Sequence, residues 1–441
     1  MNKLICLFFI LVAAINSTAQ SELSAKEAVM IALENNYQLQ IAELQQLINE
    51  KNNNWGEAGI FPTVNLSIGN NNTIQDNTNN PFTFTPGIIL AQSLNPSLNA
   101  NWNIFSGFAV RISKTRLEQL EEQSSNNALA VIETTIQDVL KAYYTAKLQE
   151  ERKNLFKTVM ELSKERFNYY QIKEQYSGVT SLESLQFRNQ YLTDSTNYRL
   201  QMISYKNSLR NLFIVMNDSS QINLDVKLTD QLELAVKEID VAVAKEEMLL
   251  NNKNLKNQYI NLQLQKTGTD LQRSFLYPTL SFQAGVNPGW SWIREIKDEL
   301  FQAETNSLTY YGNLNLRYTI FDNFKNVRAV QVAKIQEDIA QLNVKSMEQT
   351  LTSTLENLIE LYTVREDLVN ISFENVEYAK RALNLAQSRF DLGTINSIDL
   401  ASFQNSYENT MIQHLENLYN KLDTYLEIYK LTGKIGLDYT N

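Results

Sequence analysis

Four stretches of the chain alternate strictly between apolar and polar residues, the pattern of β-strands that have one apolar face and one polar face. They cover residues 63–68, 98–104, 279–284 and 313–320. The polar positions are Asn, Thr, Ser, Gln and Arg, and the apolar positions carry aliphatic and aromatic side chains. Such alternation fits either a soluble sheet or a membrane β-barrel, and the Asn-rich polar face favours the water-filled interior of a barrel.

Aromatic residues at the expected strand ends support the barrel interpretation, because outer-membrane barrels place aromatic girdles at the two membrane interfaces. Residues 70–87 and 287–307 are predicted to be long external loops. Four strands cannot close a barrel, because unpaired edges in lipid leave backbone groups without partners. The chain is therefore expected to oligomerise, with two copies supplying eight strands or three copies twelve. The aromatic residues are Phe61, Phe105, Phe275, Tyr277, Tyr310, Tyr311 and Phe321.

Long segments of the chain repeat apolar residues in steps of three and four, which predicts helices with a coiled-coil seam. A continuous helix over residues 107–177 would be about 105 Å long, longer than a bilayer is thick. The helices are therefore expected to project from the barrel as a tunnel or bundle, and a helix of about 35 residues is expected before each strand pair. The seam residues are Ile132, Ile136, Val139, Tyr143 and Ala146, then Leu351, Leu355, Leu358 and Tyr362, then Ala379, Leu383, Ala386 and Phe390.

Matched landmarks recur about 216 residues apart, which indicates a tandem duplication. Asn36 returns as Asn252, and the strand entry FPTVNLSIG returns as YPTLSFQAG. The predicted organisation is a signal peptide at 1–19, a first structural repeat at 20–228 and a second at 229–441. The predicted fold class is mixed α and β, mainly α.

The phrases GVTSLESL and GTINSIDL occupy the same place in the two repeats. Each is predicted to end a long helix with a left-handed Gly and to begin the return helix with a capping Ser, Thr or Asn. Glu183 and Asp399 are predicted to serve these caps, and they are also candidates for acids that line a tunnel entrance. The turns are the expected tips of the helical projection, where a partner docks: Gly178, Thr180, Ser181, Gly393, Asn396 and Ser397.

The first residues have one Lys, an apolar run over 4–15 and small residues near position 19, which predicts a signal peptide cleaved after Ala19. The only cysteine, Cys6, lies in that segment, so the exported chain is expected to have no thiol, no disulfide, no Cys-ligated metal and no Cys for a lipid anchor. No later stretch approaches the roughly 18 consecutive apolar residues of a membrane-spanning helix.

The charge and the histidine count narrow the function classes. A net charge of -10 makes nucleic acid a poor partner. The single histidine, His414, leaves little for a His-based metal site or a catalytic triad, and a surface or packed role is expected for it. No catalytic residue, cofactor or metal site is therefore predicted.

In its duplicated order the chain resembles the outer-membrane efflux family, the TolC-type outer-membrane factors. The resemblance covers the whole chain after the signal peptide. It rests on LSAKEAVMIALENNYQLQIA, FPTVNLS, YPTLSFQ, WNIFSGF, YTIFDNF and the paired Gly turns. It implies a homotrimer with a 12-stranded barrel in outer-membrane lipid and a long α-helical coiled-coil tunnel through the periplasm of a Gram-negative bacterium.

The same resemblance implies docking on a periplasmic adaptor (membrane fusion) protein and an inner-membrane transporter. It implies that Asp399 lies where the family places acids that narrow the tunnel entrance. Ser402 departs from the family pattern, which often has a second acid there.

The expected function is that of a passive outer-membrane channel of a tripartite efflux or type I secretion system. Drugs, metal ions and polypeptides all fit the small, polar lining. The alternative is a secreted or periplasmic coiled-coil scaffold without channel activity. An enzyme is the last choice, because the carboxylates are spread along solvated helix faces without a phosphate loop, metal-ligand cluster or nucleophile motif.

Overall fold

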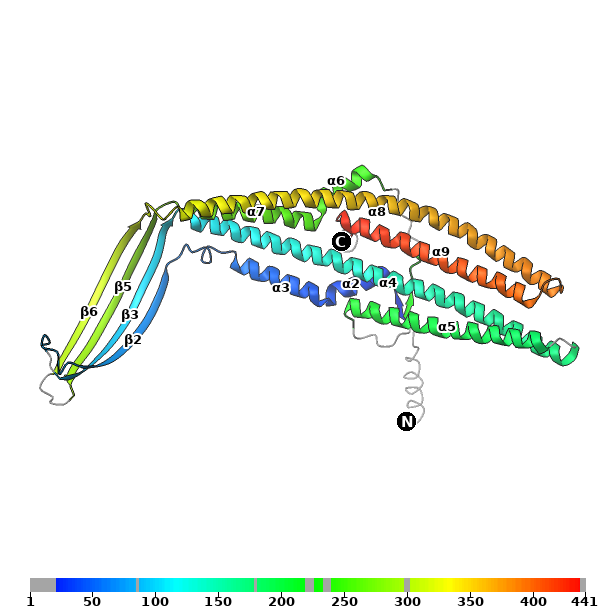
Figure 1. Cartoon of the computed structure of the whole chain (residues 1–441), viewed down its shortest axis with the longest axis horizontal. Helices are drawn as coiled ribbons and strands as arrows, with labels where there is room; N and C mark the ends of the chain where they lie inside the picture. Colours follow the sequence, from blue (N-terminus) through cyan, green and yellow to red (C-terminus); the bar gives the residue numbers. More distant parts are fainter. Residues whose placement is uncertain are drawn as a thin grey trace, which may run out of the picture. The chain divides into compact units, whose positions relative to one another are not determined.

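The computed structural model describes residues 21–84, 87–177, 181–218, 226–232, 239–296 and 302–436, and the predicted signal peptide lies outside them. One order of elements occurs twice (Figure 1). It begins with α2 (Ala25–Asn35), α3 (Tyr37–Asn52), β2 (Thr63–Asp76), β3 (Ile88–Ser106), α4 (Ala109–Ser177) and α5 (Ser181–Met216). It returns as α6 (Val241–Asn251), α7 (Lys253–Ser274), β5 (Thr279–Glu295), β6 (Gln302–Arg317), α8 (Lys325–Asp391) and α9 (Ser397–Leu431).

The chain divides into two compact units, and each takes segments from both predicted repeats. The sheet unit consists of Gln45–Ser125 and Asn257–Lys345. The helical unit consists of Met1–Leu44, Asn126–Lys256 and Ser346–Asn441. The two compact units therefore do not coincide with the two predicted sequence repeats, and the boundaries of the repeats stay a prediction.

The sheet unit contains one antiparallel four-stranded sheet in the order β2-β3-β5-β6. Its register places the apolar residues of the four alternating stretches, where these lie in the strands, on one face, as predicted. Leu66 pairs with Leu98, Leu98 with Val286, and Val286 with Tyr310. Strands β2 and β6 are the two edges, and within the described residues neither has a partner on its outer side.

The strands are longer than the alternation predicted, so the predicted external loops are wrong at residues 70–76 of the first loop and at residues 287–295 and 302–307 of the second. β2 stays paired with β3 as far as Asp76, and β5 stays paired with β6 from residue 279 to residue 294. The Asn-rich stretch after Gly69 has low intrinsic β-propensity, and its cross-strand partners override that preference. β6 in turn ends at Arg317, before the last positions predicted for it.

Tyr310 and Tyr311 were also misplaced at a strand end, because both lie inside β6. Tyr311 is on the polar face, where its hydroxyl donates to Asn99 Oδ1 at 2.8 Å across Gly285. A Cβ on Gly285 would lie 2.7 Å from the Tyr311 hydroxyl, so the hydrogen bond between Tyr311 and Asn99 in this position requires a glycine beneath it. Phe105 is the last but one residue of β3, and Phe61, Phe275, Tyr277 and Phe321 lie just outside the strands, as predicted.

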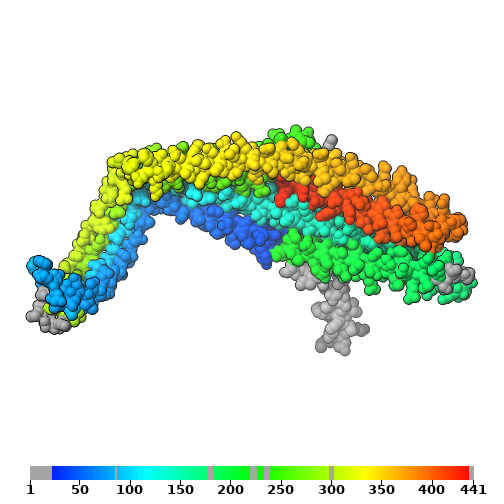
Figure 2. All heavy atoms as spheres, viewed as in Figure 1, coloured from blue at the N-terminus to red at the C-terminus, as the bar shows by residue number. Residues whose placement is uncertain are grey.

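Within the described residues of the sheet unit, the apolar face of the sheet is exposed. Leu66 and Leu316 are each 71% exposed. None of the helices of the sheet unit lies over the strands in the view of Figure 2. Large aliphatic and aromatic side chains on a contiguous face of this kind mark a surface that is covered by something other than water. Its further exposed members are Val64, Ile68, Leu98, Trp102, Phe282, Trp292, Leu308, Tyr310 and Leu314.

The helix predicted before each strand pair is broken in two, at Asn36 and at Asn252. Both residues have extended backbone angles and act as caps for the following helix. Asn36 Oδ1 accepts from the backbone N–H of Gln38 at 2.8 Å, and Asn252 Oδ1 accepts from that of Leu255 at 2.9 Å. An Asn side chain can replace a lost helical hydrogen bond in this way, which apolar periodicity alone does not reveal.

The predicted coiled-coil seams are confirmed. In α4, a helix of 69 residues, Ile136, Val139, Tyr143 and Ala146 are fully buried in the helical unit. In α8, of 67 residues, Leu355, Tyr362, Ala386 and Phe390 are buried. A short parallel pair of strands, β1 (Ser21–Leu23) and β4 (Val226–Leu228), joins the main core of this unit. No helix in the described ranges has an apolar stretch long enough to cross a bilayer.

Replacing Asn252 by Ala should destabilise the helical unit by about 1–2 kcal/mol, because the buried amide caps α7 and also donates to Leu431 O at 2.9 Å. Asn36→Ala removes only a cap and should cost less. Denaturant unfolding of the detergent-solubilised protein, followed by far-UV circular dichroism, measures both. Asn49→Ala, whose amide donates only to Gln45 O within α3, is the control, and an equal effect of all three substitutions would contradict this role for the caps.

Candidate functional site

The tip between α8 and α9 is built around Gly393, whose φ of +73° is left-handed, as predicted. The backbone N–H of Gly393 donates to Phe390 O and that of Thr394 to Arg389 O, each at 2.9 Å. These bonds satisfy carbonyls that the end of α8 would otherwise leave without partners. Gly is the residue type that adopts this conformation without a steric cost from Cβ.

The return helix α9 begins with the predicted cap. Asn396 Oδ1 accepts from the backbone N–H groups of Ile398 and Asp399, both at 2.9 Å. The Asp399 carboxylate accepts in return from the Asn396 N–H at 3.4 Å, which completes a capping box. Asp399 is therefore a capping residue on an exposed turn, and its role at a tunnel entrance stays a prediction.

At the other tip, between α4 and α5, the structure describes the two helix ends but not the turn that joins them. Gly178 and Thr180 lie outside the described residues, and so does the side chain of Ser181. α4 ends at Ser177, and α5 begins at Ser181 with Glu183 in its first turn, as predicted for that acid.

Side chains near the tips join the α4–α5 hairpin to the α8–α9 hairpin. Ser397 Oγ, from the predicted site, donates to Gln186 Oε1 at 2.6 Å. The rings of Tyr170 and Phe187 stack with centroids 4.5 Å apart, and Phe390 packs against both. Burial of the Tyr170 ring, followed by the charge of Glu183, raises the pKa of its hydroxyl to about 12.

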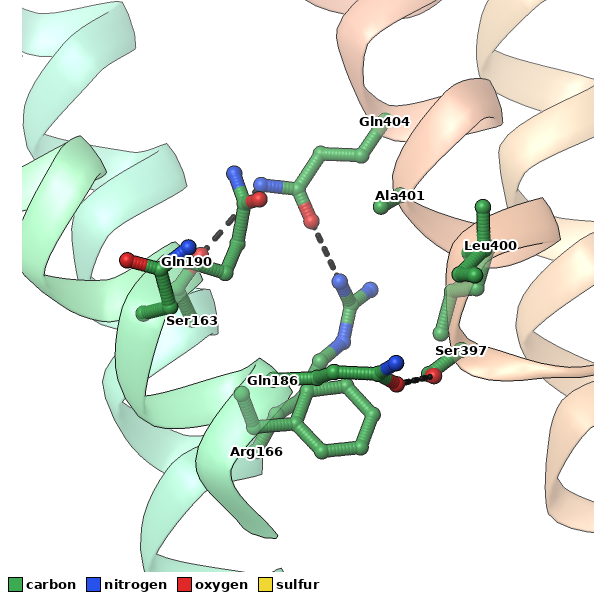
Figure 3. A pocket seen from close by; sticks show the side chains of 11 residues that line it. Ser163, Arg166, Gln186, Gln190, Ser397, Leu400, Ala401 and Gln404 are labelled. Carbon is green, nitrogen blue, oxygen red and sulfur yellow. Dashed lines mark hydrogen bonds between the residues drawn. The ribbon is translucent and has the colours of Figure 1, made fainter. Parts of the chain in front are cut away.

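A polar network continues this joint away from the tips (Figure 3). Arg166 on α4 donates to Gln404 Oε1 on α9, a bond drawn in Figure 3. It also donates to Gln387 Oε1 on α8 at 2.7 Å. Gln404 also donates to Ser163 Oγ at 3.3 Å and to Asp194 Oδ2 at 3.4 Å. The Gln404 amide on α9 therefore lies between the Arg166 guanidinium on α4 and the Asp194 carboxylate on α5, and bonds to both.

Burial shifts the ionisation of two groups in this region. It lowers the pKa of Arg166, against the opposing charges of Asp391 and Asp194. It raises the pKa of Glu408 to about 6, and the charge of Asp194 adds to that shift. These groups hold their charges less readily than they would in water.

The sequence prediction missed this network, although a signal for it was present. Ser163, Arg166 and Tyr170 follow the seam spacing of three and four along α4, and all three are buried. Ser397, Leu400 and Gln404 do the same along α9. A polar residue at a seam position is buried and needs partners, so it marks a place where helices are joined specifically.

His414 is packed, as expected, with Nδ1 at 2.9 Å from Ser372 Oγ and its ring 5.9 Å from that of Phe373. In the described part of the chain no group of three or more His, Cys, Asp or Glu side chains could hold a metal ion.

The sequence profile of a family described as "Outer membrane efflux protein" matches residues 28–216 and 245–434. A search of curated proteins found no match.

Several solved structures share the fold. The CmeC outer membrane channel of Campylobacter jejuni is 18% identical over 93% of this chain and 85% of its own, with a TM-score of 0.76. The MtrE outer membrane channel of Neisseria gonorrhoeae in its open state is 18% identical over 93% of this chain and 88% of its own, with a TM-score of 0.72. The outer membrane protein VceC of Vibrio cholerae is 11% identical over 93% of this chain and 96% of its own, with a TM-score of 0.69.

Gly393→Ala should loosen the α8–α9 tip by about 1 kcal/mol, because a Cβ at this site meets no atom within 4 Å and the cost comes only from the left-handed backbone. Hydrogen–deuterium exchange over residues 389–400 should become faster. Gly268→Ala is the matched control, since its Cβ also meets open space but the residue lies in the interior of α7, where Ala is the better helix former. Unchanged exchange in Gly393→Ala would contradict the strain.

Proposed function

The chain belongs to the outer membrane efflux protein family, and we propose that three copies assemble into one outer-membrane channel. The four strands of each copy form a third of a 12-stranded barrel. The helices of each copy form a third of a coiled-coil tunnel in the periplasm of a Gram-negative bacterium.

The single observation that carries this proposal is the unfinished sheet. Its apolar face is exposed, and its edges β2 and β6 have no outer partner in the described part of the chain. In lipid an open edge costs several kcal/mol for each unsatisfied backbone group, so the edges must pair with other copies. The apolar face then meets lipid, and the Asn-, Ser- and Thr-rich face lines a water-filled interior.

The channel acts as a passive conduit and performs no catalysis. An inner-membrane transporter supplies the energy, and a periplasmic adaptor connects it to the tips of the helical hairpins. The docking residues are Gly178, Thr180, Ser181, Gly393, Asn396 and Ser397. A duct of this kind serves tripartite efflux of small molecules and type I secretion of polypeptides by the same physical means.

The proposal is tested on protein extracted from outer membranes in mild detergent. Its mass should be that of three chains, and its addition to a planar bilayer should open water-filled channels. A monomer or dimer that stays soluble without detergent and opens no channel would instead favour the coiled-coil scaffold.

The same bilayer experiment tests Asp399 as an entrance residue. Asp399→Ala should raise single-channel conductance, because three carboxylates leave the narrowest part of the duct. Asp399→Asn separates charge from capping, since an amide oxygen can still accept hydrogen bonds at this position. The control is Asp367→Asn, an exposed acid in the middle of α8. An unchanged conductance in both Asp399 variants would show that the residue serves only as a cap.

A further inference from the structure

A cavity of about 210 Å³ lies between α4, α5 and α9, beside the joint of the two hairpins (Figure 3). It is far larger than the space that one water needs. Its wall contains one cation, Arg166, and no acid. The other polar residues on the wall are neutral amides and hydroxyls, and Phe187 and Leu400 are among its apolar members. In a chain of net charge -10, the only charged residue on the wall of this partly open cavity is therefore a cation.

Arg166 is a buried charge without a direct counter-ion. The residue is only 9% exposed, and its guanidinium donates to two neutral amide oxygens. Its Nε atom is buried and has no hydrogen-bond partner in the described part of the chain. Burying a guanidinium in this way costs free energy that a carboxylate can recover, because two parallel hydrogen bonds to a carboxylate match the planar fork of donors.

The two acids whose charges act on Arg166, Asp391 and Asp194, do not fill this role. Asp194 accepts from Ser163 and Gln190, the second at 2.9 Å, and Gln404 stands between it and Arg166. The side-chain carboxylate of Asp391 accepts from Gln387 at 2.9 Å and is likewise held at a distance from the guanidinium.

Two further donors face the same space. The Gln186 amide uses its oxygen to accept from Ser397, and its nitrogen has no partner among the described residues. The Asn189 amide lies at the exposed rim and also makes no hydrogen bond there. Amide donors, a buried guanidinium and apolar side chains on one wall suit a ligand that has an anionic end and a short hydrocarbon part.

We propose that this cavity binds a carboxylate, with Arg166 as its anchor. The carboxylate is either that of a small free acid or the acidic side chain of a protein docked at the tips. The site lies within one chain, so binding does not depend on the proposed channel activity.

The probe is glutarate, a five-carbon acid that also resembles a Glu side chain. Saturation-transfer NMR on the detergent-solubilised full chain should show transfer to its methylene protons. Arg166→Gln should weaken binding about ten-fold or more, because it removes a charge-assisted hydrogen-bond pair. Arg188→Gln, an exposed arginine on α5, is the matched control and should bind as the native protein does.

Arg166→Gln could also disturb the joint between the hairpins, so a second variant separates the two effects. Ala401→Phe fills the cavity from the wall of α9 and leaves the bonds of Arg166 in place. Loss of saturation transfer in both variants, with transfer retained in Arg188→Gln, would support the site. No transfer to the native protein, or equal transfer in all variants, would overturn it and leave a cavity filled by water.

A second arm distinguishes the two sources of the carboxylate. The capped tripeptide acetyl-Ala-Glu-Ala-amide is added as a competitor of glutarate. Displacement supports access for an acidic side chain of a docked protein, and binding of glutarate without displacement restricts the site to small free acids.

Discussion

The rest of the structure depends on one constraint, a sheet that a single chain cannot finish. Four strands place aliphatic and aromatic side chains on one face and Asn, Ser and Thr on the other, and no helix of the same unit covers the apolar face in the view of Figure 2. The two edge strands leave backbone donors and acceptors open, which a membrane does not tolerate. Under the proposed function, further copies of the chain complete the sheet and lipid covers its apolar face, and the proposed duct follows from that requirement.

The helical unit meets a different requirement, because its two hairpins, which are in contact from the Lys141–Asp423 ion pair to the tips, must be joined in one register. Apolar seams supply the packing, but a uniform seam permits sliding. Near the tips the seams change to aromatic and polar residues, and Arg166, Gln404 and Gln387 connect three helices. Because these hydrogen bonds form only in one alignment, they fix how the hairpins meet. The cavity beside Arg166 lies at this joint, so a ligand bound there would contact both hairpins.

Much of this architecture could be predicted from the sequence, because it follows from periodicity. The apolar faces of the strands, the seams of α4 and α8 and the cap at Asn396 depend on local spacing and were found. The full strand lengths could not be found in this way, since residues 70–76 are held in β2 by their partners on β3. The breaks at Asn36 and Asn252 depend on which side chain replaces a backbone bond. The Arg166 network joins residues more than 200 positions apart, and only the polar residues within the seams pointed to it.

The central claim, that β2 of one copy pairs with β6 of the next, is tested most directly by disulfide or bismaleimide cross-linking in outer membranes. The only native cysteine is Cys6, in the segment expected to be removed, so introduced thiols would have no competitor in the exported chain. Ser67→Cys on β2 is combined in turn with single cysteines along the polar face of β6. The account predicts that one register links chains into covalent trimers and no larger species. Absence of links at every register, or closure at two copies, would contradict it.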